Sequence, residues 1–116
     1  MNEKTVIKES YMFSKVIRNG KYAADKFLVV YALRNYNRTA PSKLGISVSP
    51  KNGGAVRRNR VKRLIREAFY KLYGNLPPGY FIVAVGRKPC FDGGGKMQDV
   101  LGSMRAAFVK LNLMKL

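Results

Sequence analysis

The chain has 116 residues, enough for one compact domain with its own hydrophobic core. It contains 23 lysine and arginine residues against 6 aspartate and glutamate residues, so its formal net charge is +17. Hydrophobic residues make up 47% of the sequence, which argues against a disordered chain. The charge excess destabilises an isolated compact state and indicates a polyanionic partner, with nucleic acid as the leading candidate. The alternative is a very soluble protein with a merely solvated basic face.

The single cysteine, Cys90, cannot form a disulfide within the chain, which predicts a reduced thiol and a cytoplasmic protein. Because the chain contains no histidine to activate it, Cys90 is expected to be a small buried hydrophobic residue rather than a nucleophile. The first ten residues lack the apolar run of a signal peptide. The longest apolar runs, 27–33 and 80–85, are too short to span a bilayer, so no membrane contact is expected.

The spacing of apolar residues predicts the element order α-β-β-α-β-α. A helix is expected over 11–19, followed by a connection or short edge strand at 21–26. Strands are predicted at 27–33, 43–49 and 80–85, and a last helix at about 96–113. Both alternating faces of 27–33 are apolar, which predicts a central strand. The whole chain, 1–116, is interpreted as one α/β domain, a two-layer sandwich with helices packed on a short sheet.

The stretch 55–73 carries two patterns on one predicted helix. Apolar residues recur at steps of three and four and define a buried side, and basic residues occupy the rest of the surface. Asn52 is a plausible N-cap, and Gly74 is expected to end the helix in a left-handed conformation. Arginine binds phosphate oxygens bidentately, and asparagine can contact a base edge or a sugar hydroxyl. The predicted RNA-binding set is Arg57, Arg58, Asn59, Arg60, Lys62, Arg63 and Arg66.

A second candidate surface involves Phe13, Ile17, Phe27, Val29 and Tyr31, since aromatic groups beside positive charge suit unstacked RNA bases. Ordinary core packing is the favoured interpretation of this pattern, with Tyr31 the best exception because its hydroxyl needs a polar partner. In 43–49 the small or polar residues, Ser47 among them, share one face, which would let a backbone or a ligand approach closely.

The acidic residues are scattered, whereas a protein nuclease needs carboxylates clustered on a metal or a histidine acid–base pair. Asp92 and Asp99 could meet across the glycine-rich loop, but two carboxylates give weak support for a metal site. That loop lacks the Lys-Ser/Thr of a phosphate-binding P-loop and is interpreted as a linker. The sequence therefore predicts no catalytic residue and no metal site, and a metal-dependent nuclease is kept only as a competing hypothesis.

The segment GGAVRRNRVKRLIREAF closely resembles the signature of the bacterial ribonuclease P protein component. FSKVIRNGK is similar to the first helix of that family, FLVVYAL and LGISVS to its paired strands, and VGRKP to its Arg-Lys-Pro corner. The resemblance implies a fold similar to a ribosomal-protein domain with a left-handed βαβ crossover. Ile17 stands where relatives often have a phenylalanine, so apolar contact is expected there.

The resemblance further implies a subunit of a tRNA-processing endoribonuclease, in which a catalytic RNA removes the 5′ leader of precursor tRNA. Mg²⁺ would be held mainly by the RNA, and the chain itself would be non-catalytic. The basic helix would face the catalytic RNA, and no protein–protein oligomer is required. The alternative function is a structural RNA-binding protein of ribosomal type. Implied leader-binding residues are Phe13, Ile17, Tyr31, Ser47 and Lys51, with Arg87 and Lys88 as a secondary basic corner.

Overall fold

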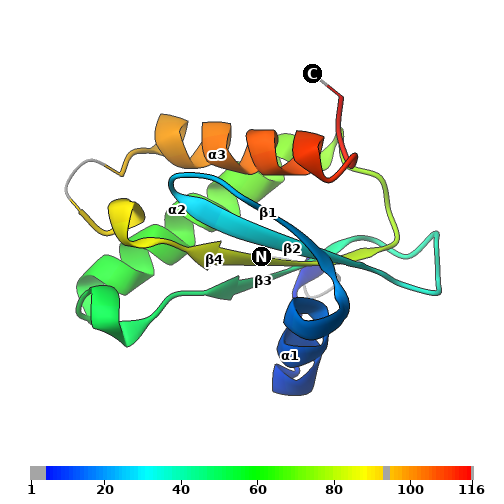
Figure 1. Cartoon of the computed structure of the whole chain (residues 1–116), viewed down its shortest axis with the longest axis horizontal. Helices are drawn as coiled ribbons and strands as arrows, with labels where there is room; N and C mark the ends of the chain where they lie inside the picture. Colours follow the sequence, from blue (N-terminus) through cyan, green and yellow to red (C-terminus); the bar gives the residue numbers. More distant parts are fainter. Residues whose placement is uncertain (1–4, 93–94, 116) are drawn as a thin grey trace.

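The structure is a computed structural model that describes residues 5–92 and 95–115. Its mixed α/β fold confirms the predicted class (Figure 1). The segment after the first helix was expected to be either a connection or a short edge strand, and it contains a strand. The element order is therefore α-β-β-β-α-β-α. The elements are α1 (Ser10–Asn19), β1 (Lys21–Ala24), β2 (Leu28–Arg34), β3 (Lys43–Ser47), the 3₁₀ helix η2 (Pro50–Asn52), α2 (Ala55–Tyr73), β4 (Tyr80–Gly86), the 3₁₀ helix η3 (Lys88–Cys90) and α3 (Met97–Lys110).

The four strands form one sheet in the order β1-β2-β4-β3. The β1–β2 and β2–β4 pairs are antiparallel, whereas β3 and β4 are parallel and are joined through α2. β2 has a partner on each side, as its two apolar faces predicted. The outer edge of β3 is partly covered by the N-terminal segment, since the amide of Ile7 donates to the carbonyl oxygen of Leu44 at 3.0 Å.

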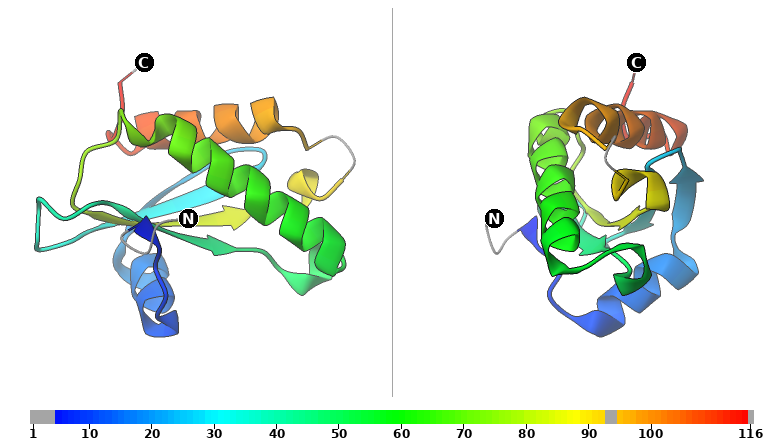
Figure 2. Two further views of the ribbon diagram at one scale, coloured as in Figure 1. Left: turned by 180° about the vertical axis from the view of Figure 1, so that it is seen from behind. Right: turned by 90° about the vertical axis from the view of Figure 1, so that its left-hand side faces the viewer.

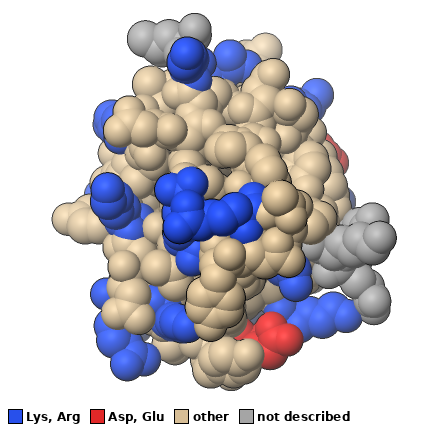
Figure 3. Space-filling view, turned by 90° about the vertical axis from the view of Figure 1, so that its right-hand side faces the viewer, with Lys and Arg blue, Asp and Glu red and all other residues tan. Residues whose placement is uncertain are grey.

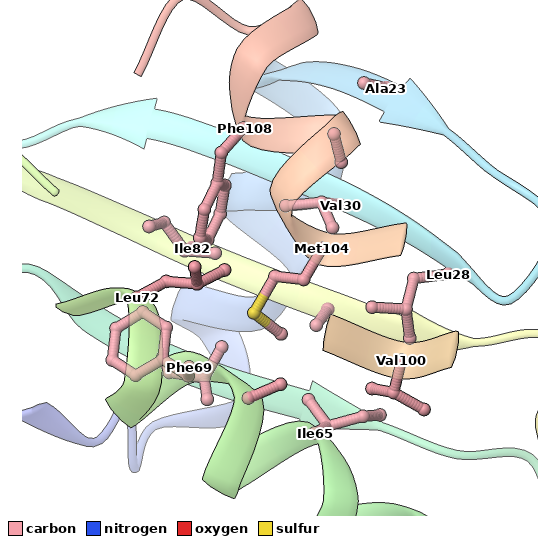
Figure 4. Packing of buried hydrophobic residues seen from close by; sticks show 14 of the residues in the cluster. Ala23, Leu28, Val30, Ile65, Phe69, Leu72, Ile82, Val100, Met104 and Phe108 are labelled. Atoms are coloured by element: carbon pink, nitrogen blue, oxygen red, sulfur yellow. The ribbon is translucent and has the colours of Figure 1, made fainter. Parts of the chain in front are cut away.

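Helices cover the two faces of the sheet unequally (Figure 2). α2 and α3 pack together on one face and enclose the main core. In this core, side chains of both helices contact side chains of the sheet (Figure 4). α1 lies alone on the other face, where Val16 and Val83 are fully buried. The predicted sandwich is thus formed by the sheet with α2 and α3, and α1 adds a partial third layer that leaves part of its sheet face open to solvent.

The ends of α2 differ from prediction. Its N-cap is Gly54, because Asn52 is already used to end η2, which starts where the Ser49 side chain accepts the Lys51 amide at 3.2 Å. Gly74 has φ −63° and ψ −21°, a right-handed conformation, so the predicted left-handed end is wrong. The chain leaves the helix instead through tight turns, in which the Asn75 amide donates to the Leu72 carbonyl oxygen at 3.0 Å.

A left-handed glycine is found at Gly79, where φ is +88°. A β-carbon there would lie 2.7 Å from the carbonyl oxygen of Arg38. The Gly79 amide donates a hydrogen bond to the carbonyl oxygen of Ala40 at 2.7 Å. We expect Gly79→Ala to lower the free energy of unfolding by about 1–3 kcal/mol, measured by urea titration. Gly74→Ala is the matched control, because its backbone is right-handed and the space around it is open, so equal stability or a small gain is expected. A neutral Gly79→Ala would contradict this reading of the turn.

Candidate nucleic-acid interface

α2 is fixed to the core by one side and presents the other to solvent. Ile65 and Phe69 are fully buried (Figure 4), and so is Val61, as the periodicity predicted. On the outer side Arg57, Asn59 and Arg63 are exposed, Arg57 beside Gly53 at the start of the helix. The packing of the inner side therefore fixes the orientation of the helix. The long side chains on its outer side stay free to move.

A basic stripe runs along the flank of α2 nearest β3. Arg58, Lys62 and Arg66 follow at intervals of four residues, and all three are half-buried. The Nε atoms of Arg58 and Arg66 are buried and have no hydrogen-bond partner in the described part of the chain. Since an unpaired buried donor is costly, these two guanidinium groups hold unused capacity for an acceptor such as a phosphate oxygen.

Arg60 differs from the other arginines of the predicted set. Its Nη2 donates a hydrogen bond to the carbonyl oxygen of Gly95, so it ties α2 to the segment before α3. The periodicity places Arg60 at the border of the apolar side and Arg63 on the opposite side, and the structure agrees, since Arg60 is half-buried and Arg63 is exposed. A substitution at Arg60 therefore removes this hydrogen bond as well as a basic group.

The surface where α1 borders the open part of the sheet, called the cleft below, contains Phe13 of α1 and Tyr31 of β2. Both are half-buried and pack against the small cluster that contains Val16 and Val83. Phe13 lies directly over Gly45 of β3, where a β-carbon would be 2.6 Å from the ring. The small face predicted for this strand is thus what lets α1 pack closely here. Ile17, one turn after Phe13, is 41% exposed.

The sheet face under α1 and the cleft crosses all four strands. Tyr22, Tyr31, Val83 and Gly45 are successive register partners from β1 to β3 and therefore share one face. The next row contains Val29, paired with Val85, which is paired with Ser47 at the end of β3. The hydroxyl of Tyr31 has no hydrogen bond in the described residues, so it is available to a ligand.

The cleft and the basic stripe meet. A hollow of about 200 Å³ lies between α1, β3, α2 and the N-terminal segment. Phe13 lines it from the cleft side, and Lys62 and Arg66 line it from α2. An extended ligand that follows the cleft past β3 would therefore arrive at two cations.

The remaining predicted residues lie at the end of the sheet where β3 and β4 finish together. Because these strands are parallel, Lys51 follows one and the Arg87–Lys88 pair follows the other. Lys51 and Lys88 are exposed, whereas Arg87 Nη1 donates to the Asp25 carbonyl oxygen at 2.7 Å. Basic charge also extends beyond these elements, since Lys and Arg side chains are spread over the face shown in Figure 3.

The carboxylates do not gather into a metal site. Asp92 and Asp99 line one open hollow, but Asp99 Oδ2 accepts the backbone amide of Lys96 at 3.1 Å and so caps α3. Within residues 5–92 and 95–115 no group of three or more His, Cys, Asp or Glu side chains could hold a metal ion. In the same residues no helix is long and apolar enough to cross a membrane.

Cys90 is fully buried, as predicted, and its Sγ donates to the Phe27 carbonyl oxygen at 2.9 Å. Burial raises the pKa of the thiol to about 11. The neutral thiol therefore makes its full contribution to stability at pH values below the ordinary thiol pKa of 9.0. This contribution is lost as the pH rises toward 11. We expect the free energy of unfolding to fall more steeply between pH 9 and 11 in the native chain than in Cys90→Ala. The free energies of unfolding are measured by urea titration at several pH values. If they fall equally with pH in both proteins, the result would contradict this.

Sequence reasoning missed Tyr22 and the packing partner of Gly45. Tyr22 was left in a segment interpreted as a connection or edge strand, and its alternation with Ala23 would have placed it on the face of Tyr31. Gly45 was recognised as small, but its partner Phe13 comes from an element far along the chain.

Comparison with known proteins shows the family to which the chain belongs. Residues 1–112 match the family model described as Ribonuclease P. The chain belongs to the ribonuclease P protein family. The ribonuclease P protein component of Clostridioides difficile is 45% identical over 82 residues, 70% of each chain. That of Clostridium acetobutylicum is 36% identical over 107 residues, 92% of this chain and 88% of the relative.

Solved structures of this family share the fold. The ribonuclease P protein of Staphylococcus aureus superposes with a TM-score of 0.81 at 29% identity, covering 94% of this chain and 96% of the other. That of Thermotoga maritima gives a TM-score of 0.77 at 30% identity, covering 95% and 94%. The resemblance inferred from the sequence is therefore confirmed.

Proposed function

We propose that this chain is the protein subunit of a ribonuclease P holoenzyme and that it contacts two RNAs at once. The stripe and outer side of α2 bind the catalytic RNA, and the cleft between α1 and the sheet binds the single-stranded 5′ leader of precursor tRNA. The observation that carries the proposal is the shared hollow, in which Phe13 of the cleft lies beside Lys62 and Arg66 of α2. The charge of +17 supports a polyanionic partner on both surfaces.

In this proposal the chain positions RNA and does not cleave it. The cations of α2 neutralise phosphates of the folded RNA, and the apolar cleft accepts unstacked bases. The described carboxylates do not form a set of ligands suited to Mg²⁺, so the ion that the reaction requires is assigned to the catalytic RNA. Leader cleavage is thereby assigned to the RNA, and the protein raises affinity for the precursor.

Reconstitution tests the proposal. The protein is mixed with its cognate catalytic RNA and a precursor tRNA at low Mg²⁺, and leader release is followed against RNA alone. We expect faster cleavage with protein than with RNA alone. The protein should also strengthen binding of precursor tRNA more than it strengthens binding of mature tRNA. Cleavage no faster than with RNA alone would refute the proposal. Cleavage by protein free of RNA, lost in Asp92→Ala or Asp99→Ala, would instead support a metal-dependent nuclease.

Tyr31→Ala is expected to separate the two surfaces. It removes a ring from the cleft floor and leaves α2 unchanged, so the holoenzyme should bind precursor tRNA about tenfold more weakly and mature tRNA equally well. Assembly with the catalytic RNA should not change. Equilibrium binding to matched precursor and mature tRNAs provides the measurement, and equal losses for both would argue against a leader cleft.

A further inference from the structure

An exposed aromatic ring continues the cleft floor onto the edge strand. Tyr22 of β1 is 67% exposed, although it is the direct register partner of Tyr31. The two ring centroids are 5.8 Å apart and the ring planes are inclined by 37°. Tyr22 therefore contacts Tyr31 from the side and keeps most of its surface in solvent.

The aromatic surface of the cleft is displaced toward β1. On the α1 wall the position one turn after Phe13 is aliphatic, because Ile17 offers a branched side chain in place of a flat ring. A nucleobase can make apolar contact there but cannot stack over an extended plane. Tyr22 and Tyr31 each supply a flat ring, on adjacent strands about 5 Å apart.

We propose that Tyr22 stacks on a nucleobase of single-stranded RNA and extends the leader site to the β1 edge of the sheet. The inference rests on the proposed leader cleft and adds a specific residue to it. A tyrosine ring stacks on any base without reading its sequence. The net charge of +17 favours a nucleic-acid ligand over an apolar protein surface here. The leader would then run from Lys62 and Arg66 over the partly exposed row of Ser47, Val85 and Val29, and on to Tyr31 and Tyr22.

Variants of Tyr22 test the inference in the reconstituted holoenzyme. Tyr22→Ala and Tyr22→Leu should each weaken precursor tRNA binding about tenfold, while Tyr22→Phe keeps the ring and stays within twofold of the native chain. Mature tRNA should bind equally to all. Tyr11→Ala is the matched control, because Tyr11 is 66% exposed in the first turn of α1, on the side of that helix away from Phe13 and Val16. Stepwise shortening of the leader should abolish the difference between Tyr22→Leu and the native chain at one particular length.

The outcomes separate this inference from the proposed function. If Tyr31→Ala weakens precursor binding and the Tyr22 variants do not, Tyr22 plays no part and the leader cleft stands. If neither position matters, the cleft itself is wrong. A second measurement does not depend on folding of the variants: leaders carrying 4-thiouridine at single positions are photocrosslinked to the native holoenzyme. Crosslinks to the peptide containing Tyr22 are expected, and crosslinks near Tyr31 with none at Tyr22 would overturn the inference.

Discussion

Simultaneous replacement of Lys62 and Arg66 by alanine is expected to weaken assembly with the catalytic RNA about a hundredfold at moderate salt. Both side chains line the hollow where the basic stripe meets the cleft, and Arg66 has a buried Nε without a partner in the described residues. Each lost phosphate contact should also reduce the slope of log affinity against log salt by about one. Filter-binding titrations at several salt concentrations measure both quantities.

A matched control removes the same charges elsewhere. Lys71→Ala with Arg105→Ala deletes one lysine and one arginine, both exposed and neither in the predicted interface. This variant should retain affinity within a few-fold, because only long-range attraction is reduced. If both double variants bind equally weakly, the affinity comes from net charge alone and the stripe has no particular role.

Phe69→Ala is expected to give the largest loss of stability, about 3–5 kcal/mol. The Phe69 ring is fully buried on the inner side of α2 and contacts the Tyr73 ring edge-on at a centroid distance of 5.5 Å. Its removal leaves a cavity between α2, α3 and the sheet. Because 5–15 kcal/mol is the usual total for a domain, much of the variant would be unfolded in mild denaturant.

Urea titration followed by circular dichroism measures this loss. Val56→Ala serves as the control on the same helix, since Val56 is 84% exposed, and a change within about 0.5 kcal/mol is expected. A loss below 1 kcal/mol at Phe69 would mean that the inner side of α2 contributes little to the core, and that the orientation of its arginines has another cause.

The sequence was most informative where the signal is local. The apolar repeat in 55–73 predicted the buried side of α2, and the two apolar faces of 27–33 predicted a central strand; both are confirmed. The short segment of β1 was ambiguous because four residues carry too little periodicity. The roles of Arg60 and Gly45 could not be predicted, since they depend on contacts with Gly95 and Phe13, which are distant in sequence. Assignment of the site residues to particular RNAs stays a prediction.

The position of β4 has a consequence for biosynthesis. This strand lies between β2 and β3, yet it is the last of the four to leave the ribosome. Until residue 86 has emerged, β2 and β3 each expose an unpaired edge in a chain that can form only the β1–β2 hairpin. Nascent chains stalled before that point should therefore be sensitive to proteases and prone to pair with one another, and those stalled well beyond it should be protected.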